Sequence, residues 1–292
     1  MLASRSRVAA ILVVIFAGLM LGGCAASVPT PEPDPTSVLD ERPIEIVLPP
    51  GHDPAVPGPL LVALHGFGSD AAGLESAYRL GAAATAEGAV YVRPQGTENA
   101  QGARFWNAGA ACCDFDESGV DDVAYVLAVI DAIADQMAID RVVLFGFSNG
   151  GFLAHRLACE HPGRLAALAV VAGAFDAPAP DCGADGPAAV LHVHGTFDPV
   201  VPYAGGSLFG RPEITGATAT VGAWVDGAGC GALEAGARFD LDTEVSDDET
   251  VPFEASCPEG RRVALWRVER GGHALEVGDD FGARVLGFAL GR

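Results

Sequence analysis

Short apolar runs alternate with segments of helical periodicity from residue 43 to the end of the chain. Apolar residues recur three and four positions apart over 121–137, which predicts a helix, and another helix is expected over 74–87. Runs that are apolar throughout, with helices between them, are typical of parallel strands covered on both faces. We therefore predict an α/β protein with a mostly parallel central sheet and helices on both faces, with strands at 59–64, 89–93, 141–145, 165–171, 189–194 and 263–268.

The first 42 residues do not follow this pattern. Two arginines precede an apolar run over 8–21, which is short for a membrane span and ends in LGGC, a sequence that resembles a bacterial lipobox. We interpret 1–23 as a lipoprotein signal peptide and Cys24 as the lipidated residue that anchors an exported protein to the membrane of the bacterial cell envelope. The Pro-rich 24–42 is then a tether to one folded domain, 43–292. An ordinary signal peptide with an incidental cysteine is the alternative.

Charge and cysteine content narrow the class of protein. The formal net charge of −21 argues against a nucleic-acid partner, because little in the chain would neutralise phosphates. Beyond Cys24 there are six cysteines, and an even number in an exported chain suggests three disulfides with fifteen possible pairings. We expect the adjacent Cys112 and Cys113 to bond to different partners. No cysteine spacing resembles a zinc site, and we expect neither a metal nor a cofactor.

The pentapeptide GFSNG around Ser148 lies between the predicted strand 141–145 and a predicted helix. A serine nucleophile in this setting needs a sharp turn that lifts its hydroxyl out of the sheet, and small residues two positions before and after it make room for that turn. Gly146 and Gly150 meet this requirement. We therefore predict that Ser148 is a catalytic nucleophile rather than a chance serine in a Gly-rich connection.

A serine hydroxyl needs a base, and the base needs an acid that orients it. Asp198 follows the predicted strand 189–194, and His273 follows the last predicted strand, so both come after Ser148 in the order acid then histidine. We predict that His273 is the general base and Asp198 its partner. The backbone N–H groups of Phe67 and Asn149 are expected to form the oxyanion hole.

Other histidines and acids have simpler interpretations. His65 and His194 each precede a glycine at a strand end and are expected to shape those turns, and His155 is expected to be structural. The competing acids precede the strand that should deliver the triad acid, and they rank below Asp198; they are Asp176, Asp181 and Asp185.

With these residues in place, the chain resembles the polyhydroxybutyrate depolymerase-like esterases, a group that includes bacterial feruloyl esterases. The matching phrases are LHGFGS at 64–69, RFWNAGAACC at 104–113, VDDVAYV at 120–126, GFSNGGFLAHRLACE at 146–160, HVHGTFDPVVPYAGG at 192–206 and GGH at 271–273. The resemblance implies an esterase of the α/β-hydrolase fold whose triad matches Ser148, Asp198 and His273. It also implies that Cys230 pairs with Cys257, which leaves two bridges near the predicted helix after Ser148 for Cys112, Cys113, Cys159 and Cys182. The chain departs from the pattern after His273, where ALEV replaces an aromatic residue and a proline.

The substrate cleft is expected to be open. Only a short connection separates Gly173 from Asp198, where many hydrolases insert a lid, so we predict no large lid. Trp106, Phe67 and Phe197 are candidates to line the cleft, with packing in the core as the alternative. The acidic stretch 240–249 is interpreted as a solvated hairpin or loop rather than a cation site.

Together these features predict a secreted, monomeric serine carboxylic-ester hydrolase that acts on small or polymeric esters of the feruloyl or short-chain hydroxyalkanoate type. A serine peptidase of the same fold is a second hypothesis, although the chain shows no amine-binding acidic cluster. A cell-surface lipoprotein that uses the fold only for binding is a third, and the intact triad argues against it.

Overall fold

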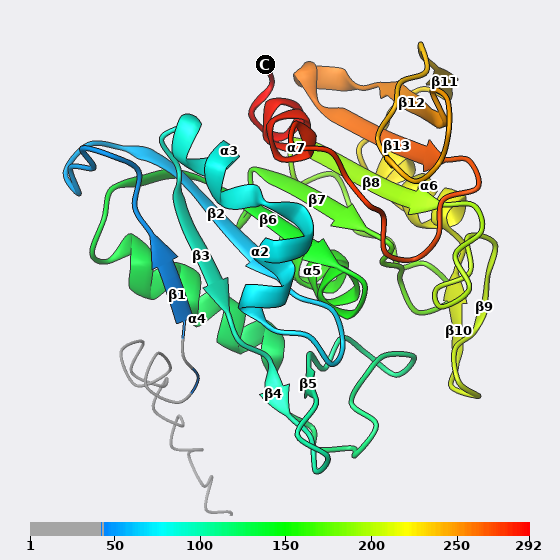
Figure 1. Ribbon diagram of the computed structural model, residues 1–292, viewed down its shortest axis with the longest axis horizontal. Coiled ribbons are helices and arrows are strands. Elements are labelled where there is room, and N and C mark those ends of the chain that lie inside the picture. The colour runs from blue at the N-terminus through cyan, green and yellow to red at the C-terminus, as the bar shows by residue number, and fades with distance from the viewer. Residues whose placement is uncertain (1–41, 43) are drawn as a thin grey trace, which may run out of the picture. The chain divides into compact units, whose positions relative to one another are not determined.

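A nine-stranded sheet runs through the part of the chain that the computed structural model describes, residue 42 and residues 44–292 (Figure 1). In chain order its strands are β1 (Ile44–Val47), β2 (Gly58–Leu64), β3 (Val90–Pro94), β6 (Ile139–Phe147), β7 (Ala167–Val171), β8 (Ala189–Gly195), β11 (Leu233–Ala235), β12 (Thr250–Ser256) and β13 (Arg262–Val268). In space they lie in the order β1-β3-β2-β6-β7-β8-β13-β12-β11. The six neighbouring strands β3, β2, β6, β7, β8 and β13 pair in parallel. Antiparallel strands complete the sheet, β1 at one edge and β12 and β11 at the other.

Helices cover both faces of this sheet because its strands are apolar on both faces. Along β2, Leu60 and Val62 pack into the core under α4, α5 and α6, whereas Leu61 and Ala63 pack into the core under α2, α3 and α7. The mostly parallel sheet between two helical layers is thus confirmed. The helices are α2 (Ala71–Tyr78), α3 (Leu80–Ala86), α4 (Asp122–Ala134), α5 (Asn149–Glu160), α6 (Ala217–Gly227) and α7 (Phe281–Leu290), with a 3₁₀ turn η1 (Pro258–Gly260).

Two additional small sheets lie outside the central one. They pair β4 (Thr97–Glu98) with β5 (Arg104–Phe105), and β9 (Gly205–Ser207) with β10 (Glu213–Thr215). The β9–β10 hairpin follows the carboxyl end of β8, which is the side of the sheet where parallel α/β proteins build their sites. It supplies part of the pocket described below.

Two expectations need correction beyond shifts of a few residues at the ends of elements. The helix expected over 74–87 is two helices, because Arg79 adopts a left-handed conformation with φ 47° and ends α2. The acidic stretch is not fully solvated, since Asp242 and Glu249 are buried. Oε1 of Glu249 accepts hydrogen bonds from the N–H groups of Leu241 and Asp242, so the carboxylate holds the loop in place.

The predicted signal peptide, Cys24 and the tether up to residue 41 lie outside the described residues. Within residues 42 and 44–292, no helix is both long enough and apolar enough to cross a membrane.

Candidate active site

Ser148 sits in a tight turn between β6 and α5. Its backbone has φ 51° and ψ −121°, an uncommon conformation for a residue with a side chain, and its hydroxyl projects from the turn. A Cβ atom on Gly146 would lie 2.4 Å from the carbonyl oxygen of Gly150, and one on Gly150 would lie 2.4 Å from that of Leu64. The turn therefore requires glycine at both positions, as the pentapeptide predicts.

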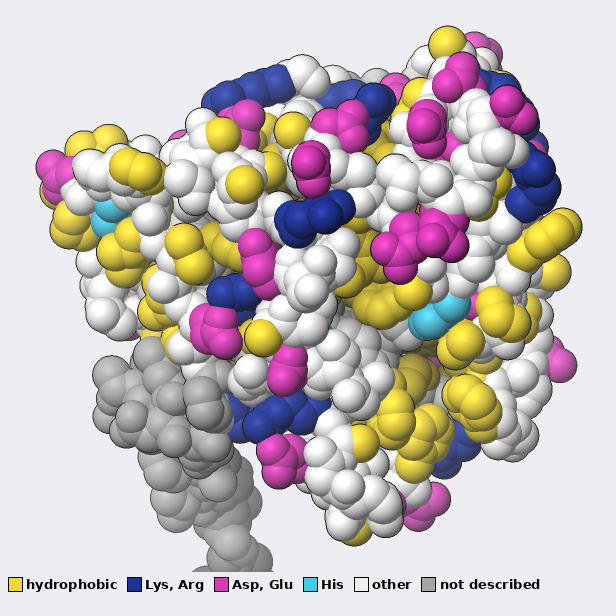
Figure 2. All heavy atoms as spheres, viewed as in Figure 1, with side chains coloured by type: hydrophobic (Ala, Val, Ile, Leu, Met, Phe, Trp, Pro, Cys, Tyr) yellow, Lys and Arg dark blue, Asp and Glu magenta, His cyan; other side chains and the backbone are white. Residues whose placement is uncertain are grey.

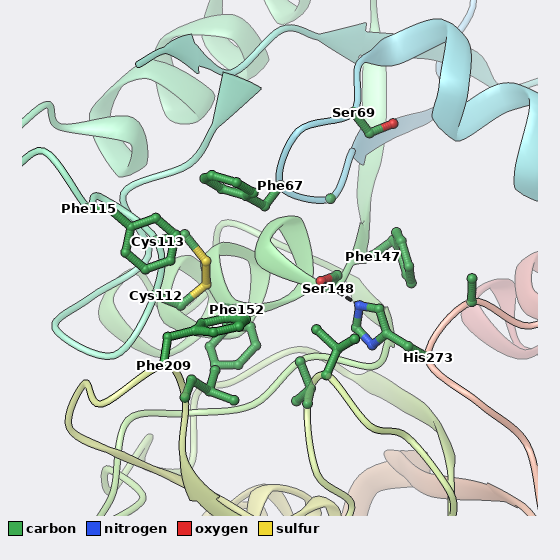
Figure 3. Close-up of a pocket in the computed structure, with 15 residues that line it drawn as sticks. Phe67, Ser69, Cys112, Cys113, Phe115, Phe147, Ser148, Phe152, Phe209 and His273 are labelled. Carbon is green, nitrogen blue, oxygen red and sulfur yellow. Dashed lines mark hydrogen bonds between the residues drawn. A yellow bond between two sulfur atoms is a disulfide. The ribbon is translucent and has the colours of Figure 1, made fainter. Parts of the chain in front are cut away.

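The structure brings the three predicted triad side chains together, and Figure 3 shows two of them, Ser148 and His273. Oγ of Ser148 lies 2.9 Å from Nε2 of His273, and Nδ1 of His273 lies 2.8 Å from Oδ2 of Asp198. The second carboxylate oxygen of Asp198 accepts hydrogen bonds from the N–H groups of Val200 and Val201, each at 2.8 Å. A carboxylate held in this way fixes the imidazole with Nδ1–H toward Asp198 and the Nε2 lone pair toward Ser148.

The loops that carry the acid and the histidine are joined by backbone hydrogen bonds. The Thr196 N–H donates to the carbonyl of Val268, and the Phe197 N–H donates to that of Gly271. A Cβ atom on Gly195 would come within 2.3 Å of the Gly271 carbonyl oxygen, so glycine permits this close approach. The parallel pairing of β8 with β13 therefore extends into both loops and sets the distance between Asp198 and His273.

Asp198 is ionised in this setting. Burial alone would raise the pKa of its carboxyl, but the side-chain hydrogen bonds of His194 and His273 and the charge of His273 outweigh burial and hold that pKa well below its usual range. Asp198 therefore remains an anion over the pH range in which a histidine changes charge.

The two predicted oxyanion donors are the backbone N–H of Phe67, in the loop after β2, and that of Asn149, which directly follows Ser148. Within the described residues, neither the Phe67 N–H nor the Asn149 N–H donates a hydrogen bond to a protein acceptor. Both residues follow the ends of neighbouring parallel strands, β2 and β6. Unpaired N–H groups at this position are what a developing oxyanion requires.

Trp106 does not line the cleft, and the prediction that it does is wrong. The side chain is fully buried, and its indole N–H donates to the carbonyl of His65. The Asn149 side chain accepts from the Trp106 N–H at 2.7 Å and donates to its carbonyl at 2.8 Å. The indole bond links Trp106 to the end of β2, just before Phe67, and the two bonds with Asn149 link its backbone to the start of α5.

His65 shapes its turn as expected. Its Nδ1–H donates to the Gly66 carbonyl and its Nε2 accepts from the Gly96 N–H. Burial lowers the pKa of His65 to about 4, so the ring is neutral and both nitrogens have fixed roles.

Cys112 and Cys113 are bonded to each other, which corrects the expectation of different partners. The peptide bond between them is cis, and it brings their Cα atoms to 3.1 Å, whereas a trans peptide would hold them 3.8 Å apart. The remaining bridges join Cys159 to Cys182 and Cys230 to Cys257, and the latter is the pairing that the resemblance implies.

An apolar pocket of about 590 Å³ opens beside Ser148 (Figure 3). Figure 2 shows hydrophobic side chains gathered around a histidine on this face of the molecule. Among the described residues, the polar side chains that line this pocket are those of Ser69, Ser148 and His273. Its apolar lining comprises Phe67, Cys112, Cys113, Phe115, Phe147, Phe152, Val200, Val201, Leu208, Phe209 and Ala274. Most of these residues were not predicted, because the β9–β10 hairpin and the loop before α4 are brought here only by tertiary packing.

Phe197 lies outside this lining and exposes 70% of its surface, so it neither lines the pocket nor packs in the core. Phe67 does line it, and its ring contacts that of Phe115 edge to face at 5.2 Å between centroids. Phe209 in turn lies 6.1 Å from Phe115, and Arg211 in the same hairpin donates to the Asp114 carbonyl. The β9–β10 hairpin and the loop that contains the Cys112–Cys113 disulfide are therefore in contact, and together they form one wall of the pocket.

No group of three or more histidine, cysteine or acidic side chains suited to a metal ion occurs in the part of the chain that the structure describes. The described residues include the acidic stretch 240–249.

Several known proteins are similar to this chain in sequence. A model of the phospholipase/carboxylesterase family matches residues 51–212. Feruloyl esterase C of Emericella nidulans is 30% identical over 178 residues, 58% of this chain and 59% of that protein. Feruloyl esterase B of Piromyces equi is 28% identical over 244 residues, 80% of this chain and 42% of that protein. The chain spans about half the length of the curated relatives it matches.

Among solved structures, an acetyl xylan esterase from Aspergillus awamori aligns with a TM-score of 0.60. The alignment covers 84% of this chain and 93% of that chain at 14% sequence identity. At this identity the likeness shows the fold alone.

Proposed function

This chain belongs to the phospholipase/carboxylesterase family, and we propose that it is a carboxylic-ester hydrolase in which Ser148 is the nucleophile. The observation that carries the proposal is the continuous line of hydrogen bonds from Oγ of Ser148 through His273 to Asp198, at the edge of an apolar pocket. The feruloyl esterases among the relatives support ester hydrolysis as the reaction.

In the proposed mechanism, Oγ of Ser148 attacks the ester carbonyl while Nε2 of His273 takes its proton. Asp198 stabilises the resulting imidazolium, and the N–H groups of Phe67 and Asn149 donate to the oxyanion of the tetrahedral intermediate. His273 then gives the proton to the leaving alcohol oxygen, the C–O bond breaks, and an acyl-serine remains. Water attacks this acyl group with His273 again as base, which releases the acid and restores the Ser148 hydroxyl.

The pocket beside Ser148 favours esters with an apolar group. Its wall of phenylalanine rings and the vicinal disulfide offers area for a planar ring or an alkyl chain, and it offers few partners for a polar substituent. The names of the relatives support an aromatic acyl group of the feruloyl type. Short-chain hydroxyalkanoate esters are the second substrate class, and their small acyl group would fill less of the pocket.

Steady-state hydrolysis of p-nitrophenyl butyrate tests the proposal. Ser148→Ala removes the nucleophile and is expected to lower kcat by at least about 10³-fold, since triad residues act as a unit. The exposed Ser246, far along the chain in the acidic loop, provides a matched control, and Ser246→Ala is expected to leave the rate unchanged. Retention of more than a tenth of the activity by Ser148→Ala would show that another group is the nucleophile.

We also propose that the enzyme is exported, because three disulfides persist best in an oxidising compartment. Lipidation of Cys24 stays a prediction from the sequence, and loss of radiolabelled palmitate from a Cys24→Ser variant would test it.

A further inference from the structure

Three buried histidines form a hydrogen-bonded line that leads to the triad acid. Nε2 of His155 lies 3.1 Å from Nδ1 of His192, and Nε2 of His192 lies 3.1 Å from Nδ1 of His194. His194 lies in β8, three residues before the turn that carries Phe197 and Asp198, and its Nε2 lies 2.8 Å from the Val201 carbonyl oxygen and 3.4 Å from Oδ2 of Asp198. The three rings are each at most 1% exposed.

The groups at the two ends of the line determine which nitrogen of each ring donates and which accepts. The indole N–H of Trp224, which can only donate, lies 3.1 Å from Nδ1 of His155. Nδ1 of His155 must therefore be an acceptor, and its proton must be on Nε2, where it donates to His192. The same reasoning applies at each step, so His192 donates from Nε2 to His194. At the far end, the Val201 carbonyl can only accept, which independently requires a proton on Nε2 of His194.

The line also requires that all three rings be neutral. A second proton on any of them would set two N–H donors against each other, either between two imidazoles or between His155 and Trp224. Burial lowers the pKa of His155 to about 3 and holds that of His192 well below its usual value, in agreement with the geometry. Polar groups near the line include the Asp198 carboxylate, Tyr203, whose ring meets His194 edge to face, and Arg267, the register partner of His194 on β13.

We propose that Trp224 and this line of imidazoles position the triad acid, by ensuring that His194 presents an N–H and never a lone pair to Asp198. The inference rests on the proposed function, since it concerns the same triad. His194 fixes residue 201 through its carbonyl, while the N–H of that residue donates to Oδ1 of Asp198. Both oxygens of the carboxylate are thereby held: Oδ1 by the turn, and Oδ2 between His194 and His273. His194 is a positioning residue, because it acts on the reaction only through Asp198.

The tautomers can be observed directly in the wild-type enzyme. Long-range ¹H–¹⁵N correlation spectra of the full chain with ¹⁵N-labelled histidine distinguish the two neutral tautomers and the cation, and single His→Gln variants assign the signals. We expect each of the three rings to carry a proton on Nε2, and His155 and His192 to stay neutral from pH 5.5 to 8.5. A proton on Nδ1 of His155 or His192, an Nε2 without a proton in any of the three, or titration of His155 or His192 within this range would overturn the proposal.

Variants test the effect on the reaction. His194→Leu removes the donor and is expected to lower kcat for p-nitrophenyl acetate at least about tenfold with KM within about twofold, whereas His194→Gln, whose amide N–H can reach the Nε2 position, should recover most of the loss. His161→Gln, in a loop away from the line, is the control and should match the wild type. Equal kcat for His194→Leu and wild type, or equal loss in both His194 variants, would show that His194 does not position the acid. An active Ser148→Ala variant would instead refute the proposed function and leave the tautomer measurement valid.

Discussion

At the scale of single residues, the proposed chemistry depends on backbone positions that accept no side chain. Gly146 and Gly150 lie against each other across the turn that presents Ser148, and Gly195 lies against the histidine loop. These contacts involve backbone atoms, which cannot rotate away as a side chain can. A methyl group added at such a position therefore shifts the backbone that carries the nucleophile or its base.

Gly146→Ala is expected to lower the free energy of unfolding by about 2 kcal/mol or more, because the added methyl would overlap the Gly150 backbone. It should also reduce kcat more than tenfold, since the turn that carries Ser148 must shift. Gly222→Ala in α6 is the matched control: no atom lies within 4 Å of its added Cβ, and alanine should stabilise the helix by about 0.5–1 kcal/mol. Urea unfolding and p-nitrophenyl butyrate turnover measure both effects, and equal behaviour of the two variants would contradict this account.

At the scale of elements, the parts of the fold that could be predicted are those governed by local pattern. The parallel strands are apolar throughout, so their runs stand out, and Ser148, Asp198 and His273 could be assigned because each follows such a run. The antiparallel strands β1, β11 and β12 are short or partly exposed, so their sequences lack that signal.

The pocket could not be predicted in the same way. Leu208 and Phe209 reach it from the β9–β10 hairpin, whose place depends on the long-range bond from Arg211 to the Asp114 carbonyl. Cys112 and Cys113 are joined by a cis peptide bond and by a disulfide, and the residue types indicate neither feature. Trp106 looked like a cleft residue because it lies in a polar loop, yet Asn149 holds that loop against the core.

The wall formed by the β9–β10 hairpin and the disulfide loop leads to a prediction about substrates. Within the feruloyl type of ester, this wall should favour a ring without a hydroxyl. Burying a hydroxyl without a partner costs about 1–3 kcal/mol, so kcat/KM for methyl cinnamate should exceed that for methyl p-coumarate and methyl ferulate by about 5- to 160-fold. Phe209→Ala should lower kcat/KM for methyl cinnamate more than for p-nitrophenyl acetate, whose acyl group is too small to reach the wall. Phe197→Ala, outside the pocket, should change neither. A preference for the hydroxylated esters would show that the ring binds elsewhere.

At the scale of the whole molecule, buried neutral histidines couple folding to pH. Burial lowers the pKa of His65 to about 4 and that of His155 to about 3, and it holds that of His192 well below its usual value. In the unfolded chain these rings have a pKa near 6.5, so between pH 6.5 and about 4 the unfolded state binds more protons than the folded state. Folding is therefore disfavoured as the pH falls through this window.

The free energy of unfolding is expected to fall by about 3–4 kcal/mol for the step from pH 6 to pH 5, which corresponds to nearly three protons taken up on unfolding. Urea titrations at fixed pH, followed by tryptophan fluorescence, would measure it. Because few carboxyl groups with ordinary pKa titrate above pH 5, the histidines should dominate this range. A loss below about 1.4 kcal/mol would mean that fewer than one proton is taken up, contrary to the burial of these rings.

The most direct test of the central claim is to find which atom becomes covalently modified. The wild-type enzyme would be treated with a fluorophosphonate, digested, and examined by peptide mass spectrometry, with Ser148→Ala treated alongside. We predict a single stoichiometric adduct on the peptide that contains Ser148 in the wild type, and no adduct in the variant. Labelling of another residue, or equal labelling of wild type and variant, would contradict the assignment of Ser148 as the nucleophile.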